Sequence, residues 1–160
     1  DVAQGGMPAL GDNPLFLGCA DYRSTIASNV ESSGFTFPEE MRRHADKGTA
    51  LVTDKDPGDA EIAEVVSQAA AHSCIVLGTY NGHILQGQLR LAKALAATGL
   101  PMILVALRNP YDLRNMPNHV AALAGWEYTR PLFDALWPVL NGTARPTGKL
   151  PLLTLTKAAK

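Results

Sequence analysis

Polar and aromatic side chains gather in four short stretches of this sequence, each directly after a run of aliphatic residues. They include carboxylates, amides, an imidazole, guanidinium groups and phenols, which can bind a ligand, hold an interface or transfer a proton. The residues of this kind that we select as a candidate edge are Asn81, His83, Arg108, Asn109, Tyr111, Asp112, Glu127 and Tyr128. An ordinary loop cap explains any one of them taken singly. Four such stretches together predict a surface that faces a substrate or a partner.

Two of these residues have side chains suited to acid–base catalysis, Glu127 with its carboxyl group and His83 with its imidazole. A lone histidine in a loop is usually just exposed or hydrogen-bonded. Glu127 is selected only because its carboxylate follows a predicted strand. The sequence by itself therefore assigns no catalytic residue, and Glu127 and His83 stay open as two alternatives.

Metal and nucleotide chemistry find little support. None of the four histidines has a second histidine, a cysteine or a glutamate at ligand spacing, so we expect no metal site. The sequence has no G-x-S-x-G motif, and neither a GxxxxGK[ST] nor a GxGxxG loop follows the first predicted strand, so we expect no cofactor. Cys19 and Cys74 each lie inside an apolar run, which favours buried free thiols over a disulfide.

The composition of the chain fits one globular domain. It has 160 residues, of which 46% are hydrophobic and 18% charged. Fourteen basic residues against fifteen acidic ones leave a net charge of −1, which disfavours nucleic acid as a partner. Its apolar runs fall far short of the ~18 residues that a membrane-spanning helix needs. The chain starts with Asp1 rather than Met and shows no signal peptide, so we expect a processed chain or a piece of a longer one.

The aliphatic runs predict the strands of a parallel sheet. Residues 15–20, 74–80 and 102–108 show no alternation of apolar and polar residues, as expected of strands that are covered on both faces. Weaker strands are expected at 49–54 and 120–126. Residues 149–156 are a tentative edge strand, because Pro151 tolerates only an edge or a strand start.

Helical patterns separate these strands. Residues 60–71 carry an amphipathic stripe, with Asp56 expected as the cap and Pro57 as the first helical residue. Further helices are expected from Pro38 to a stop at Gly48, over residues 85–98 and over residues 131–140.

The alternation predicts an α/β fold, a three-layer α/β/α sandwich around a mostly parallel, doubly wound sheet of about five or six strands. Residues 1–12 are expected to be a loose lead-in or linker, and residues 13–160 a single sandwich domain. In such a sheet the carboxyl ends of the strands meet at one edge, which would bring the candidate residues together.

Three strings carry a family resemblance: VLGTYNGHILQGQ at 76–88, VALRNPYDL at 105–113 and GKLP at 148–151. In this order and spacing they resemble the C-terminal α/β domain of glycoside hydrolase family 3, and specifically its β-N-acetylglucosaminidase branch. The Thr53-Asp54-x-Asp56-Pro57 pattern and the Glu127-Tyr128 pair are similar too, so the resemblance runs from about residue 10 to residue 156.

The resemblance implies a retaining glycosidase of two domains. An N-terminal (β/α)8 barrel would carry the aspartate nucleophile, and this domain would pack beside the mouth of the barrel. Such a barrel needs about 250 residues, more than this whole chain holds, so the nucleophile would lie on a missing domain. The implied substrates are cell-wall or chitin-type oligosaccharides with terminal β-linked N-acetylglucosamine. The candidate edge would contact the barrel and the distal sugar, with Arg108 as an anchor.

The acid/base residue separates two branches of that family. In the β-glucosidase branch a glutamate follows the strand that corresponds to residues 74–80, but residues 79–92 here contain no Glu or Asp. The β-N-acetylglucosaminidase branch instead uses a His-Asp dyad on a barrel loop, so the lack of an acid here agrees with that branch.

Two other functions stay open at this point. The domain could be a non-catalytic module, either a structural one that stabilises its barrel or oligomer without touching sugar or a carbohydrate-binding one. It could also be a free-standing flavodoxin-like domain for a small anionic ligand. The missing phosphate loop argues against the flavodoxin-like domain. For a bacterial enzyme of this kind, both a cytoplasmic and an exported location are compatible with the sequence.

Overall fold

The structure, a computed structural model, describes residues 6–21, 34–114 and 116–148 of the chain. Within these residues, strands and helices alternate along the sequence. The strands are β1 (Pro14–Cys19), β2 (Thr49–Thr53), β3 (Cys74–Thr79), β4 (Met102–Ala106) and β5 (Ala121–Ala124). The helices are α1 (Phe37–Ala45), α2 (Asp59–Ala69), α3 (Gln86–Ala96), the 3-10 helix η1 (Pro110–Leu113) and α4 (Arg130–Leu140).

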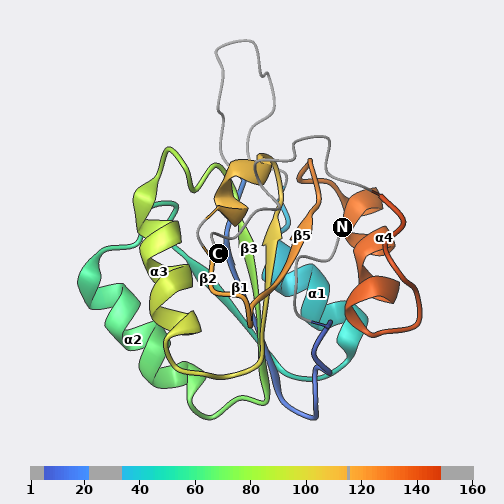
Figure 1. Ribbon diagram of the computed structural model, residues 1–160, viewed down its shortest axis with the longest axis horizontal. Coiled ribbons are helices and arrows are strands. Elements are labelled where there is room, and N and C mark those ends of the chain that lie inside the picture. The colour runs from blue at the N-terminus through green and yellow to red at the C-terminus, as the bar shows by residue number, and fades with distance from the viewer. Residues whose placement is uncertain (1–5, 22–33, 115, 149–160) are drawn as a thin grey trace.

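The described strands form one parallel sheet in the order β2-β1-β3-β4-β5. In β1, Leu15 pairs with Thr49 of β2 on one side and with Ile75 of β3 on the other. Helices α2 and α3 cover one face of the sheet, and α1 and α4 cover the other (Figure 1). The predicted α/β/α sandwich with a doubly wound sheet is therefore confirmed. The expected edge strand at 149–156 lies outside the described residues.

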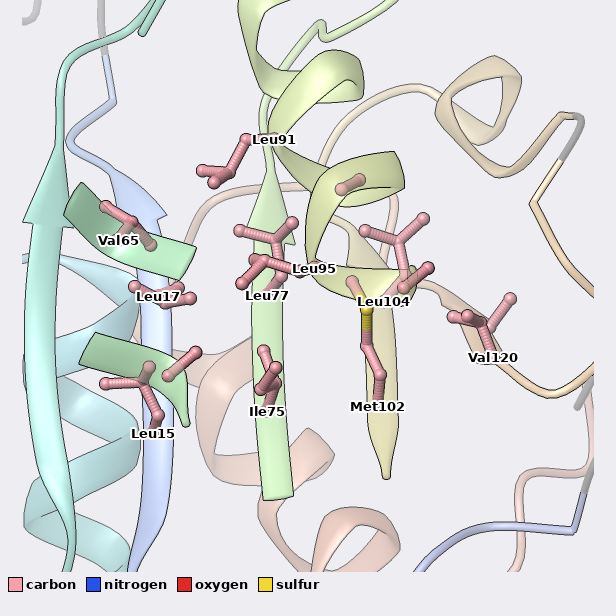
Figure 2. Packing of buried hydrophobic residues seen from close by; sticks show 14 of the residues in the cluster. Leu15, Leu17, Val65, Ile75, Leu77, Leu91, Leu95, Met102, Leu104 and Val120 are labelled. Carbon is pink, nitrogen blue, oxygen red and sulfur yellow. The ribbon is translucent and has the colours of Figure 1, made fainter. Parts of the chain in front are cut away.

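Each face of the sheet has its own hydrophobic core. On the face of α2 and α3, leucines such as Leu77 of β3 and Leu95 of α3 pack together (Figure 2). On the opposite face, Val76 packs among aromatic side chains of α1 and α4, where the Phe37 and Phe133 rings meet edge to face at 5.4 Å. Burial on both faces explains why the strand sequences are continuously apolar.

Two helix ends differ from the sequence prediction. Helix α2 begins at Asp59 with Gly58 as its N-cap, so Asp56 is not the cap and Pro57 is not the first helical residue. The Asp56 carboxylate instead accepts a hydrogen bond from the amide of Gly87, at 2.7 Å. Helix α1 ends at Ala45, before the predicted stop at Gly48, because Asp46 adopts a left-handed conformation (φ 52°) and ends it.

The segment before β1 contributes to the domain as far as it is described. Leu10 is buried, and its carbonyl accepts a hydrogen bond from the Ser73 hydroxyl just before β3, at 2.6 Å. The division between a lead-in at 1–12 and the domain at 13–160 stays a prediction. None of the helices among the described residues is both long and apolar enough to span a bilayer.

Candidate functional site

The strand order changes direction between β1 and β3, and the carboxyl ends of these strands lie at one edge of the sheet. From β1 the chain moves outward to β2 on one side, and the later strands β3, β4 and β5 lie on the other side. Ligands of open α/β sheets bind where the order reverses in this way. The loop after β3 and the turn after β4 meet at this edge, and they carry most of the residues selected from the sequence. Asp21 follows the end of β1 by two residues.

The carboxylate of Asp112 organises the edge. Asp112 lies in η1, is fully buried, and is 30 residues away from its partner Gly82 in the sequence. Its Oδ2 accepts a hydrogen bond from the Gly82 amide at 2.9 Å, and its Oδ1 accepts one from the His83 amide at 2.7 Å. Pro110 favours η1 because its fixed φ suits the start of a helix. The turn after β4 therefore holds the loop after β3 in place.

Asn81 shapes the loop from the inside. It is buried, at 5% exposure, and its backbone is left-handed with φ of 56°, a conformation that asparagine tolerates better than most residues. Its carbonyl accepts hydrogen bonds from the amides of Ile84 and Leu85, at 2.9 and 3.1 Å. Asn81 thus forms the turn that leads into α3 rather than presenting its side chain on the surface.

His83 is oriented by the same carboxylate. Its Nδ1 lies 3.1 Å from Asp112 Oδ1, while 28% of its side chain is exposed. Because a carboxylate only accepts hydrogen bonds when ionised, Nδ1 must carry the proton, and Nε2 becomes the acceptor in the neutral ring. The Tyr111 ring lies beside it, with ring centroids 5.8 Å apart, and the Arg114 guanidinium lies over Tyr111 at 4.7 Å.

Gln88 and Asp56 also fix this edge, and sequence reasoning missed both roles. Gln88 is buried in the first turn of α3; its Oε1 accepts from the Tyr80 amide at 2.8 Å, and its Nε2 donates to the carbonyls of Tyr80 and Lys55. One signal was available in the sequence: Gln88 precedes Leu91 by three residues and so lies on the buried stripe of its helix. Nothing local indicates that Asp56 binds Gly87.

Arg108 and Asn109 follow β4. The Arg108 guanidinium is on an exposed residue, and its Nη1 donates a hydrogen bond to the Tyr80 hydroxyl at 2.8 Å. It also lies over the Tyr80 ring, 5.6 Å from the centroid. Asn109 is half-buried and precedes η1 as its N-cap, without a side-chain capping bond. Arg108 is therefore an exposed residue whose guanidinium is held against Tyr80 at this edge.

The two candidate residues after β5, Glu127 and Tyr128, have different surroundings. Glu127 is exposed, and among the described residues no contact joins it to His83. The Tyr128 hydroxyl accepts from the Phe37 amide at 2.7 Å and donates to the Cys19 carbonyl at 3.1 Å. Burial raises the pKa of Tyr128 well above its usual range. Tyr128 therefore ties the end of β1 to the start of α1.

The backbone amides of the edge are already used by the protein itself. Gly82 and His83 donate to Asp112, and Gly87 at the start of α3 donates to Asp56. A phosphate site of the flavodoxin kind needs such amides to be free for the ligand. This arrangement disfavours the free-standing domain for a small anion. In the part of the chain that the structure describes, no three His, Cys, Asp or Glu side chains group as metal ligands would.

The fold has counterparts among solved structures. One is a glycoside hydrolase family 3 β-N-acetylglucosaminidase from Paenibacillus sp. strain FPU-7, with a TM-score of 0.80 and 21% identity over 98% of this chain. The chain shares its fold with part of that enzyme. A fungal multi-domain family 3 β-N-acetylglucosaminidase, which has a GCN5-related glucosamine N-acetyltransferase region, matches with a TM-score of 0.71 and 17% identity over 94% of this chain.

These matches confirm, for the fold, the resemblance that the sequence strings indicated. This chain spans 31% of the length of the Paenibacillus enzyme and 17% of the fungal one. It therefore corresponds to one part of larger, multi-domain proteins. No protein-family model matches the chain, and no curated protein matches it.

Proposed function

We propose that this chain is the α/β-sandwich domain of a bacterial glycosidase that hydrolyses terminal β-linked N-acetylglucosamine from cell-wall or chitin-type oligosaccharides. The observation that carries the proposal is the structural match over 98% of the chain to part of a β-N-acetylglucosaminidase. Two of the strings on which the sequence resemblance rests, those around Asn81 and Asp112, are also joined to each other by hydrogen bonds at the carboxyl edge of the sheet.

The site chemistry agrees with a domain that does not supply the nucleophile. A retaining glycosidase needs a carboxylate free to attack the sugar and an acid/base group, about 5 Å apart. Asp112 is fully buried, and both of its oxygens accept hydrogen bonds from the loop after β3, so it cannot attack a sugar. The nucleophile would come from a (β/α)8 barrel domain of the same protein, the partner that the resemblance implies.

The carboxyl edge of the sheet would then face the barrel. Barrel enzymes bind substrate at the face formed by the loops after their strands. The Arg108 guanidinium, with its donors in a fixed planar array, suits a carboxylate or several carbonyls across an interface. In this arrangement the domain completes a cleft whose reacting groups lie on the barrel.

The test compares the full-length protein with the 160-residue chain. Both are assayed on 4-nitrophenyl β-N-acetylglucosaminide, with 4-nitrophenyl β-glucoside as the matched control substrate. We expect turnover of the acetamido sugar by the full-length protein only. Clear turnover by the isolated chain, or a full-length protein that prefers the glucoside, would contradict the proposal.

A further inference from the structure

The loop after β3 carries a partly exposed imidazole, that of His83, whose hydrogen bond to the Asp112 side chain involves Nδ1. The Asp112 carboxylate takes the amides of Gly82 and His83 and the Nδ1 of His83, all within 3.1 Å. The backbone of His83 is therefore fixed along with its ring. With Nδ1 directed at the buried carboxylate, Nε2 lies on the other side of the imidazole, on a side chain that is 28% exposed.

Such a ring is a preorganised hydrogen-bond acceptor. In the neutral imidazole the carboxylate fixes the Nδ1–H tautomer, which leaves the lone pair on Nε2. The exposed Tyr111 lies beside this imidazole, with the two ring centroids 5.8 Å apart. An acceptor beside an aromatic ring suits a ligand with hydroxyl donors and apolar C–H faces, which is the chemistry of a sugar.

We propose that His83 binds the leaving-group side of the oligosaccharide, with Nε2 accepting a hydrogen bond from a sugar hydroxyl and Asp112 acting as the positioning residue. This inference rests on the proposed function. The sugar that is cleaved must sit in the barrel beside the nucleophile, so a group on the neighbouring domain meets the part of the substrate that extends out of the barrel. His83 therefore contributes to the choice of substrate.

The first experiment needs no enzymatic activity. The tautomer of His83 is read from the 15N NMR shifts of the two ring nitrogens in the 160-residue chain at neutral pH. The expected result is a protonated Nδ1 and an unprotonated Nε2. The opposite tautomer, or a ring protonated on both nitrogens, would overturn the inference because Nε2 would then be a donor.

The second experiment uses the full-length protein and two substrates, N,N′-diacetylchitobiose and 4-nitrophenyl β-N-acetylglucosaminide. His83→Ala is expected to raise the KM for the disaccharide about tenfold, as loss of ~1.4 kcal/mol of hydrogen bonding would, and to leave the aryl glycoside unchanged. His83→Gln, which restores an acceptor, should recover part of the loss. His119→Ala is the matched control, because His119 contacts the Ala96 carbonyl before β5, at the other end of the sheet.

Asp112→Asn tests the positioning role. It should raise the KM for the disaccharide as His83→Ala does, and shift the tautomer signal of His83; if this variant does not fold, the His83 variants and the NMR result decide. An unchanged KM in His83→Ala, or an equal loss of kcat on both substrates, would overturn the inference while leaving the proposed function intact. A wild-type protein inactive on both substrates would instead refute the proposed function, and this inference with it.

Discussion

Asp112 shows how much of this edge depends on one buried side chain. It is placed by a 3-10 helix after β4 but acts on the loop after β3. A buried carboxylate is costly unless hydrogen bonds compensate for its lost hydration, and here three N–H groups do so. The loop after β3, which is partly exposed, is held in place by these hydrogen bonds to the buried Asp112. The residues exposed at this edge and the buried residues that support them are therefore different residues.

The two buried cysteines lead to a prediction on pH. Burial raises the pKa of Cys19 to about 12 and that of Cys74 to about 11, from an ordinary value of 9.0. Both thiols thus stay protonated in the folded state at a pH where the unfolded chain ionises them. Their contribution to stability is complete below pH 9 and falls as the pH rises toward 11 and 12, by about 1.4 kcal/mol per pH unit for each thiol.

Urea unfolding at a series of pH values between neutral and 10.5 would measure this fall. The variant carrying both Cys19→Ala and Cys74→Ala should lose less stability over the same interval, although its stability at neutral pH is lower. An identical pH dependence in the variant and the wild type would show that other groups cause the fall.

At the scale of elements, strand β3 packs closely against the start of helix α1. Gly78 lies in its second half, and a Cβ built there would be 2.5 Å from Phe37 Cδ1 and 2.8 Å from Leu107 Cδ1. Both neighbours are buried, so neither side chain has open space to move into. The absence of a side chain at Gly78 therefore allows α1 to approach the sheet.

Gly78→Ala is expected to lower the free energy of unfolding by about 1–3 kcal/mol, because overpacking forces Phe37 off its position. Gly6→Ala is the matched control, since a Cβ at Gly6 meets nothing within 4 Å. Chemical denaturation of both variants gives the comparison. A Gly78 variant as stable as the Gly6 variant would mean that α1 shifts at no cost.

The elements also show what the sequence could and could not predict. The central strands were predictable because β1, β3 and β4 are covered on both faces and are therefore apolar without interruption. The cap of α2 was predicted wrongly because the partner of Asp56 is the amide of Gly87, across a gap of 31 residues. Asn81 was expected on the surface and is buried, because its loop folds inward onto Asp112. Contacts between distant loops leave no local pattern to detect.

At the scale of the whole molecule, the carboxyl edge combines a hydrogen-bonded loop with exposed apolar side chains. Ile84, next to His83, has 67% of its surface exposed, and Tyr111 has 39%. Exposed apolar residues on an ordered edge are typical of surfaces that another domain covers. The 31% of the Paenibacillus enzyme that this chain spans leaves ample length there for such a domain. If the proposed barrel packs here, Ile84 is one of the side chains that it buries.

Ile84→Glu tests this packing in the full-length protein. A buried charge at a domain interface should weaken the association by roughly 2 kcal/mol or more, so limited proteolysis should separate the two domains faster than in the wild type. The same substitution in the isolated 160-residue chain should leave its melting temperature unchanged, because Ile84 is already exposed there. Ala63→Glu, on the exposed side of α2, is the control that adds the same charge away from the edge. Equal protection of the Ile84 and Ala63 variants from the protease would place the barrel contact elsewhere on the domain.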